Sequence, residues 1–161
     1  MKNFFVLICI ILSTSSKIFA QYPITKYSPK LPQLNKNIID ILDTMIGKTI
    51  YRGECWDVAK LVLNQTNASW DKKFNFGKSL NYKLDTILPG DIIQFSNATI
   101  KMPDNITWIF EQHTAIVYQV ISPQKYIIAH QNVNGNRRLQ TDTIQISYIV
   151  NGKIAFFRPY K

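Results

Sequence analysis

The chain has 161 residues, 46% of them hydrophobic, and a formal net charge of +9 at pH 7. This length suits one domain with one hydrophobic core. The Lys and Arg residues are scattered apart from Arg137-Arg138, so we expect no specific nucleic-acid site. A basic surface favours polyanions, for example a cell-surface polymer, as partners, and ordinary solubility explains the scattered charges equally well. Internal repeats, heptads and glycine-rich phosphate loops are absent, which excludes repeat architectures, coiled coils and P-loop enzymes.

The first twenty residues have the order of a secretory signal peptide. Lys2 supplies a positive start, residues 4–12 form an apolar run, and the small Ala20 precedes Gln21. The run is much shorter than the roughly 20 residues that span a bilayer. We therefore predict a signal peptide over residues 1–20, a secreted or periplasmic location and no stable membrane anchor. A retained anchor is the alternative. Removing the segment would lower the net charge from +9 to +7.

The rest of the chain begins with helical patterns. Residues 21–34 contain three prolines and predict an extended lead-in to a single domain over residues 35–161. Apolar residues at helical spacing predict helices over 35–46 and 54–64. The polar and aromatic stretch 67–81 is expected to be a loop with a short helix.

The second half of the domain has the pattern of strands. β-Branched and aromatic segments predict strands over residues 92–95, 114–120, 126–132, 139–146 and 153–158. Asn134-Gly135 predicts a tight hairpin. Residues 96–110 are long for a hairpin connection, and loops of that length are often functional, for example as lids. Helices followed by an antiparallel meander indicate an α+β fold, with the N-terminal helices packed on the sheet.

Cys55 is the one cysteine that remains after removal of the predicted signal peptide, so no intramolecular disulfide can form. A lone thiol in an exported protein is either buried and inert or a nucleophile. Cys55 falls in the first turn of its predicted helix, where backbone N–H groups and the helix dipole would stabilise a thiolate. The same N–H groups could hold an oxyanion. Tyr51, just upstream, is a candidate for a further donor.

A base for this thiol would come from His113 or His130. His113 opens the strand HTAIVYQV and His130 lies in the next strand, YIIAHQNV. Neighbouring antiparallel strands bring such residues within reach of each other. The period of two places Tyr126, Ile128, His130 and Asn132 on one face. Because this series ends in two polar residues, we expect that face to open onto a site.

Other roles for the same residues stay open. Cys55 could be a buried small hydrophobe, and a strand histidine is more often structural than catalytic. Cys55, His113 and His130 could also bind zinc. No tight ligand pair such as CxxC or HxxxH is present, and the HxE…PCxxC deaminase pattern is absent. We therefore expect no metal and no cofactor.

Four pieces of the chain resemble the NlpC/P60 and CHAP groups of papain-like cysteine hydrolases. They are GECWDVAKLVLN, LPGDIIQF, HTAIVYQV and IIAHQNVNG. The resemblance implies a papain-like half-barrel core in which Cys55 is the nucleophile, His113 the base and His130 the orienting residue. Asn132 matches the QN that follows the third residue in CHAP-like sequences. Asp91, in the P-G-D turn, is implied to be architectural.

The resemblance implies hydrolysis of an amide bond, most naturally in peptidoglycan peptides. The pieces GECWD, PGDIIQF and HQN are also similar to the cysteine-proteinase-fold domain of fungal actin-patch adaptor proteins. That similarity implies an alternative, a non-catalytic binding domain on the same fold. A secreted thiol peptidase or acyltransferase with another substrate is the third possibility. The Asn-x-Ser/Thr sequons at Asn64, Asn67, Asn97 and Asn105 would suit a glycosylated eukaryotic protein.

Overall fold

The computed structural model describes residues 30–161. The predicted signal peptide (1–20) and most of the predicted lead-in (21–34) lie outside the described residues. Within them the elements are α1 Gln33–Met45, α2 Cys55–Gln65, β1 Lys78–Leu80, β2 Ile92–Lys101, β3 Thr107–Ser122, β4 Lys125–His130, β5 Gln140–Gln145 and β6 Ile149–Arg158. A short 3₁₀ turn, Ile146–Tyr148, precedes β6.

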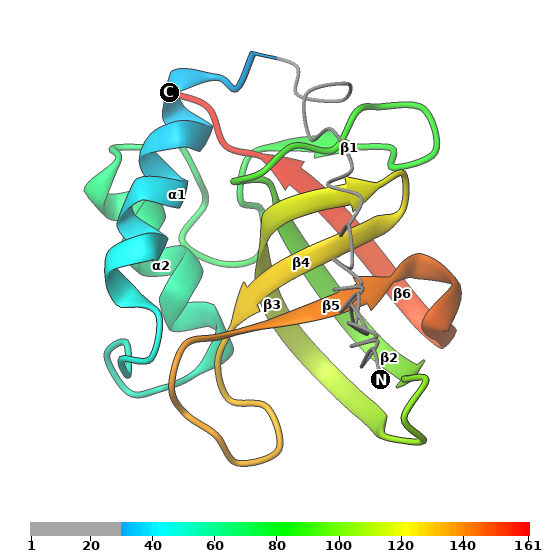
Figure 1. Cartoon of the computed structure of the whole chain (residues 1–161). Helices are drawn as coiled ribbons and strands as arrows, with labels where there is room; N and C mark the ends of the chain where they lie inside the picture. Colours follow the sequence, from blue (N-terminus) through cyan, green and yellow to red (C-terminus); the bar gives the residue numbers. More distant parts are fainter. Residues whose placement is uncertain (1–29) are drawn as a thin grey trace, which may run out of the picture.

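The strands form one antiparallel sheet in the order β1-β6-β2-β3-β4-β5. Figure 1 shows the sheet curling, so that β5 crosses in front while β2 and β6 run behind. The two helices lie together at one side of it. This is the α+β arrangement of helices on an antiparallel sheet that the sequence predicts.

The alternation of side chains along the strands separates two cores. On the helix side, Ile38 and Leu42 of α1 and Val62 of α2 pack against Ile92 and Ile116 of the sheet. The other core fills the inside of the curled sheet and takes residues from β2 to β6; its fully buried members include Phe95, Val117, Ile128, Ile144 and Phe156. Because neighbouring residues of a strand point to opposite sides, each central strand contributes to both cores.

The expectation of a long loop over residues 96–110 is wrong. β2 continues to Lys101 and β3 begins at Thr107, and these two residues are the last pair before the turn. The physical reason is a second stretch of alternation: Ala98 and Ile100 are buried, as is Trp108 on the partner strand. The polar residues between them occupy the other face, which hides the strand pattern in the sequence. His113 therefore lies in the middle of β3 and does not open it.

The helix expected within residues 67–81 does not form. Asp71 organises a turn instead, because its Oδ1 accepts the backbone N–H groups of Lys73 and Asn75. Ser69 makes an isolated bridge with Tyr160, near the end of the chain. The segment then ends in β1, which pairs with β6.

The P-G-D turn has the architectural role that was expected. Asp91 is fully buried, and its carboxylate accepts hydrogen bonds from Asn35, from the backbone N–H of Leu88 and from Arg158. The pair of bonds from Arg158, at 3.0 and 2.8 Å, is a bidentate ion pair. These contacts join α1, the start of β2 and the end of β6.

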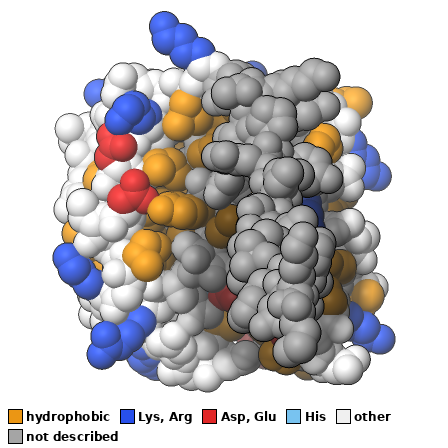
Figure 2. Space-filling view, in the orientation of Figure 1, with side chains coloured by type: hydrophobic (Ala, Val, Ile, Leu, Met, Phe, Trp, Pro, Cys, Tyr) orange, Lys and Arg blue, Asp and Glu red, His pale blue; other side chains and the backbone are white. Residues whose placement is uncertain are grey.

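Charged side chains do not gather on one part of the visible surface. In Figure 2 the Lys and Arg side chains are spread around the edge of the face, and hydrophobic side chains lie nearer its middle. Over residues 30–161, no helix combines the length and apolar character needed to cross a membrane.

Candidate active site

Cys55 is the first residue of α2 and lies against β3. Glu54 is the N-cap, and it forms a reciprocal capping box with Asp57 that fixes the start of the helix. β3 has no β4 partner beyond the Ile116–Ala129 pair. Of the nearby backbone N–H groups, that of Thr114 in this part of β3 does most to lower the pKa of Cys55. The thiol is thus held beside the residue that follows His113.

The expectation that Cys55 is a thiolate is wrong for the protein without substrate. Burial raises the pKa of the thiol above its ordinary value. The backbone N–H groups of Thr114, Trp56 and Cys55 itself act in the opposite direction, and the nearby Glu54 carboxylate raises the pKa further. Desolvation is the largest of these effects, so the resting side chain is a neutral thiol.

The loop before Cys55 is fixed by Gln131, a residue that the sequence analysis did not single out. Its side chain is fully buried. It accepts the N–H of Ile50 and donates to the carbonyl groups of Ile50 and Glu54, at 3.1, 3.1 and 2.7 Å. A buried amide with these partners holds the loop at a set distance from the end of β4. The sequence signal was only the QN pair that follows His130.

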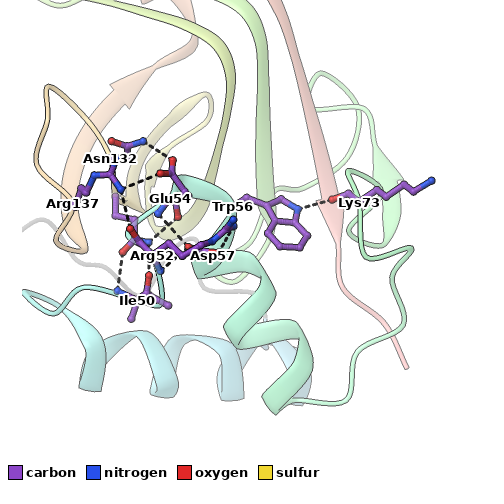
Figure 3. Close-up of polar contacts among 9 residues, drawn as sticks. Ile50, Arg52, Glu54, Trp56, Asp57, Lys73, Asn132 and Arg137 are labelled. Carbon is purple, nitrogen blue, oxygen red and sulfur yellow. Dashed lines mark hydrogen bonds and ion pairs between the residues drawn. The ribbon is translucent and has the colours of Figure 1, made fainter.

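Asn132 does not contact either histidine. Its side chain donates to the Glu54 carboxylate at 2.8 Å, and Arg137 forms an ion pair with the same carboxylate at 3.1 Å. Figure 3 shows these two residues converging on Glu54, while Arg52 reaches Asp57 in the first turn of the helix. The polar cluster therefore positions the N-terminus of α2, directly next to Cys55.

The two histidines are in direct contact. Nε2 of His113 lies 3.0 Å from Nδ1 of His130, with both side chains buried. Phe110 stacks on the His113 ring at a centroid distance of 4.0 Å, and Trp108 packs edge-on against His130. These aromatic walls fix both rings and exclude water from the pair.

Asp142 of β5 extends the pair to a row of three and was missed by the sequence analysis. Its Oδ2 lies 2.8 Å from Nε2 of His130 and accepts a second hydrogen bond from Gln140 at 2.6 Å. The hydrogen bond to His130 is the main cause that lowers the pKa of Asp142. The row thus ends in a carboxylate that is ionised at neutral pH.

Burial has a strong effect on His113. It lowers the pKa of His113 to about 3, and the neighbouring His130 adds to the shift.

The expectation that the face of Tyr126, Ile128 and His130 opens onto a site is also wrong. Tyr126 and Ile128 belong to the core inside the curled sheet, so the histidines lie at the end of a buried face.

The remaining sequence candidates lie apart from this row. Tyr51 is exposed in the loop between the helices, with Lys60 above its ring. Among the described residues, no hydrogen bond joins the side chain of Cys55 to that of His113. No group of three or more His, Cys, Asp or Glu side chains suited to a metal ion comes together in residues 30–161.

Two solved structures of Ly7917 are similar to this chain. The structure of Ly7917 with the hydrolyzing product of MDP matches with 16% identity and a TM-score of 0.49, covering 78% of this chain and 63% of that one. A second crystal structure of Ly7917 matches with 15% identity and a TM-score of 0.48, covering 76% of this chain and 62% of that one. This chain thus spans less than two thirds of the length of Ly7917. No curated protein matches the chain.

The family comparison covers the two helices and the whole sheet. The model of the AIM3/BBC1 cysteine proteinase-fold domain matches residues 32–161. The match includes Cys55, His113, His130 and Asp142. Because it extends over most of the chain, the protein belongs to the family of AIM3/BBC1 cysteine proteinase-fold domains.

Proposed function

We propose that this domain is a cysteine hydrolase that cleaves an amide bond, with Cys55 as nucleophile, His113 as base and His130 as the orienting residue. The observation that carries the proposal is the 3.0 Å contact between the two buried histidines. His113 directly precedes Thr114, whose backbone N–H lowers the pKa of Cys55 at the start of α2. A nucleophile at a helix start, a base and a third residue behind the base form the general arrangement of thiol hydrolases. The cysteine-proteinase fold of the family supports the same reading.

The resting state constrains the chemistry. Both Cys55 and His113 are neutral at pH 7, so the thiol would lose its proton as it attacks. The proton moves to Nδ1 of His113, a C–S bond forms, and the carbonyl oxygen becomes an oxyanion. The backbone N–H groups of Cys55 and Trp56, which lie in the first turn of α2, would donate to that oxyanion.

The second half of the reaction returns every group to its starting state. The C–N bond breaks, the leaving nitrogen takes the proton from His113, and a thioester remains on Cys55. A water molecule then gives a proton to His113 and attacks the thioester carbon. The C–S bond breaks, and the sulfur recovers its proton from His113.

We propose that the substrate is a peptidoglycan peptide and that the protein is secreted or periplasmic. The substrate rests on the resemblance of the GECWD and HTAIVYQV segments to NlpC/P60 and CHAP enzymes, and the location rests on the signal-like residues 1–20. The basic net charge of the chain supports an affinity for polyanionic cell-surface polymers.

The test compares the protein without residues 1–20 with its Cys55→Ala and His113→Ala variants on isolated peptidoglycan, following the release of new amines. We expect release by the unchanged protein and none above background from Cys55→Ala. His113→Ala should lose on the order of 10²-fold or more in rate. Asp40→Asn, on the exposed side of α1, serves as a control that keeps full activity.

A casein digest run in parallel separates the parts of the proposal. Cys55-dependent cleavage of casein without cleavage of peptidoglycan would remove the substrate and keep the hydrolase. Equal release by the unchanged protein and Cys55→Ala on both substrates, or no release from either substrate, would refute the hydrolase itself.

A further inference from the structure

We propose that Asp142 is a positioning residue, which sets the proton arrangement of both histidines so that Nδ1 of His113 is free to accept a proton. The inference rests on the proposed function and deepens it. It is carried by the row in which the Asp142 carboxylate, His130 and His113 are joined by contacts of 2.8 and 3.0 Å.

The proton arrangement follows from the carboxylate end of the row. An ionised carboxylate can only accept hydrogen bonds, so Nε2 of His130 must carry the proton that it donates to Asp142. In a neutral His130, Nδ1 is then an acceptor. The 3.0 Å contact therefore requires Nε2 of His113 to be the donor. That leaves the lone pair of His113 on Nδ1.

The row also offers a place for the proton that His113 accepts. His113 is buried against Phe110 and Phe95, and a charged imidazolium there would be poorly solvated. If Nε2 of His113 passes its proton to Nδ1 of His130, the positive charge rests on the ring that contacts Asp142. The Asp142 side chain is 32% exposed, whereas that of His130 is fully buried. The carboxylate thus links the buried charge to a solvated group.

Other contacts hold the carboxylate in this orientation. Gln140 donates to the same Oδ2 that accepts from His130, at 2.6 Å. The side chain of Asn136 donates in turn to Gln140. Trp108 closes one side of the His130 ring. The contact between His130 and Asp142 is therefore supported by Gln140 on the same strand as Asp142, by Asn136 in the preceding loop and by Trp108 of β3.

The experiment uses the protein without residues 1–20, labelled with ¹⁵N-histidine, at pH 8. Long-range ¹H–¹⁵N spectra distinguish an imidazole that is protonated on Nε2 from one protonated on Nδ1. We expect both His113 and His130 to be protonated on Nε2 in the unchanged protein. In Asp142→Ala the acceptor is lost, so both rings should show a mixture of the two forms.

Two further variants separate the proton arrangement from the charge of Asp142 and provide a control. In Asp142→Asn an amide oxygen can replace the Oδ2 atom that accepts hydrogen bonds from Gln140 and His130. This variant should therefore keep the proton arrangement of the histidines but lose the negative charge. We expect kcat to fall on the order of 10²-fold or more in both Asp142 variants, with KM changed less than threefold. Asp40→Asn, an exposed Asp on α1 paired with Lys36, is the matched control and should change neither quantity.

The outcomes separate this inference from the proposed function. A different proton arrangement in the unchanged protein, or unchanged spectra in Asp142→Ala, overturns the role of Asp142 whether or not the protein hydrolyses a substrate. An active protein whose Asp142 variants keep their kcat also overturns it. A protein that shows the expected spectra but no hydrolysis contradicts the hydrolase and leaves the histidine arrangement established.

Discussion

The reactivity of Cys55 depends on a competition between two local effects. The start of α2 directs backbone N–H groups at the sulfur, which favours the thiolate, and burial favours the neutral thiol. Burial is the larger effect. Attack by a neutral thiol would need a general base, which is the role that we propose for His113.

Alkylation of Cys55 by iodoacetamide should follow the raised pKa of the thiol. We expect the rate to increase with pH and to reach its midpoint above about 8.5, the ordinary thiol value. Rate constants measured by mass spectrometry between pH 6 and 10 on the protein without residues 1–20, which lacks Cys9, test this, with Cys55→Ser as the unlabelled control. Glu54→Gln should lower the midpoint, because the carboxylate raises the thiol pKa. Fast, pH-independent labelling between pH 6 and 7 would contradict the neutral resting thiol.

At the scale of elements, the site depends on how strands end and where they pair. β4 pairs with β3 only as far as Ala129, and the thiol of Cys55 lies where that pairing stops. At the strand irregularity between Ser96 and Thr99 on β2, β6 approaches β2 very closely at Gly152. A Cβ atom at Gly152 would lie 2.2 Å from the carbonyl oxygen of Asn97.

Gly152→Ala should therefore destabilise the sheet. Gly152 has φ +88°, and Gly135, in the hairpin turn, has φ +77° with nothing within 4 Å of an added Cβ. Both alanines have the same unfavourable backbone conformation, worth about 1–2 kcal/mol. Only Gly152→Ala adds the clash, so we expect it to cost at least about 2 kcal/mol more than Gly135→Ala. Urea unfolding followed by circular dichroism measures the difference. Equal losses would show that β6 can move away from β2.

For the whole molecule, the buried histidine makes stability depend on pH. The folded pKa of His113 is about 3, below its value in an unfolded chain. The unfolded state therefore binds more protons between about pH 3 and 6.5, and stability falls as the pH falls through this window. Asp142, with its lowered pKa, adds a loss only below the ordinary Asp value. Asp91, whose pKa is raised by burial, acts in the opposite direction.

A comparison with His113→Gln isolates the histidine. The unchanged protein should lose about 2 kcal/mol more than the variant between pH 7 and pH 5, at 1.36 kcal/mol for each pH unit below 6.5. Urea unfolding at a series of pH values gives both slopes, and the Asp contributions cancel in the difference. Parallel slopes for the two proteins would show that His113 is not buried as a neutral ring.

Much of the architecture could be predicted from local patterns. Apolar spacing located both helices, and β-branched runs located parts of the five long strands. The position of Cys55 at a helix start and of His113 and His130 on neighbouring strands also follows from the sequence, because both depend on short-range periodicity. Where polar residues covered one face, as at 96–101, the strand was missed although its buried alternation is present.

Asp142 illustrates what local patterns cannot supply. The bridge between Val133 and Asn136 would, in an uninterrupted hairpin, bring Asp142 opposite Ile127. The observed pairing is shifted by one residue, with Ile128 opposite Asp142 and His130 opposite Gln140. Because a shift of one residue exchanges the two faces of a strand, it places the carboxylate on the side of His130.

The sequence by itself determined the α+β fold, the helix start at Cys55 and the two histidine strands, since these arise from contacts between residues near one another in the chain. Tertiary structure alone decided the strand register that adds Asp142 to the row and the packing that buries His113. It also decided the balance of burial and N–H groups that keeps Cys55 a neutral thiol. Register, burial and desolvation depend on segments far apart in the sequence, and no local pattern records them.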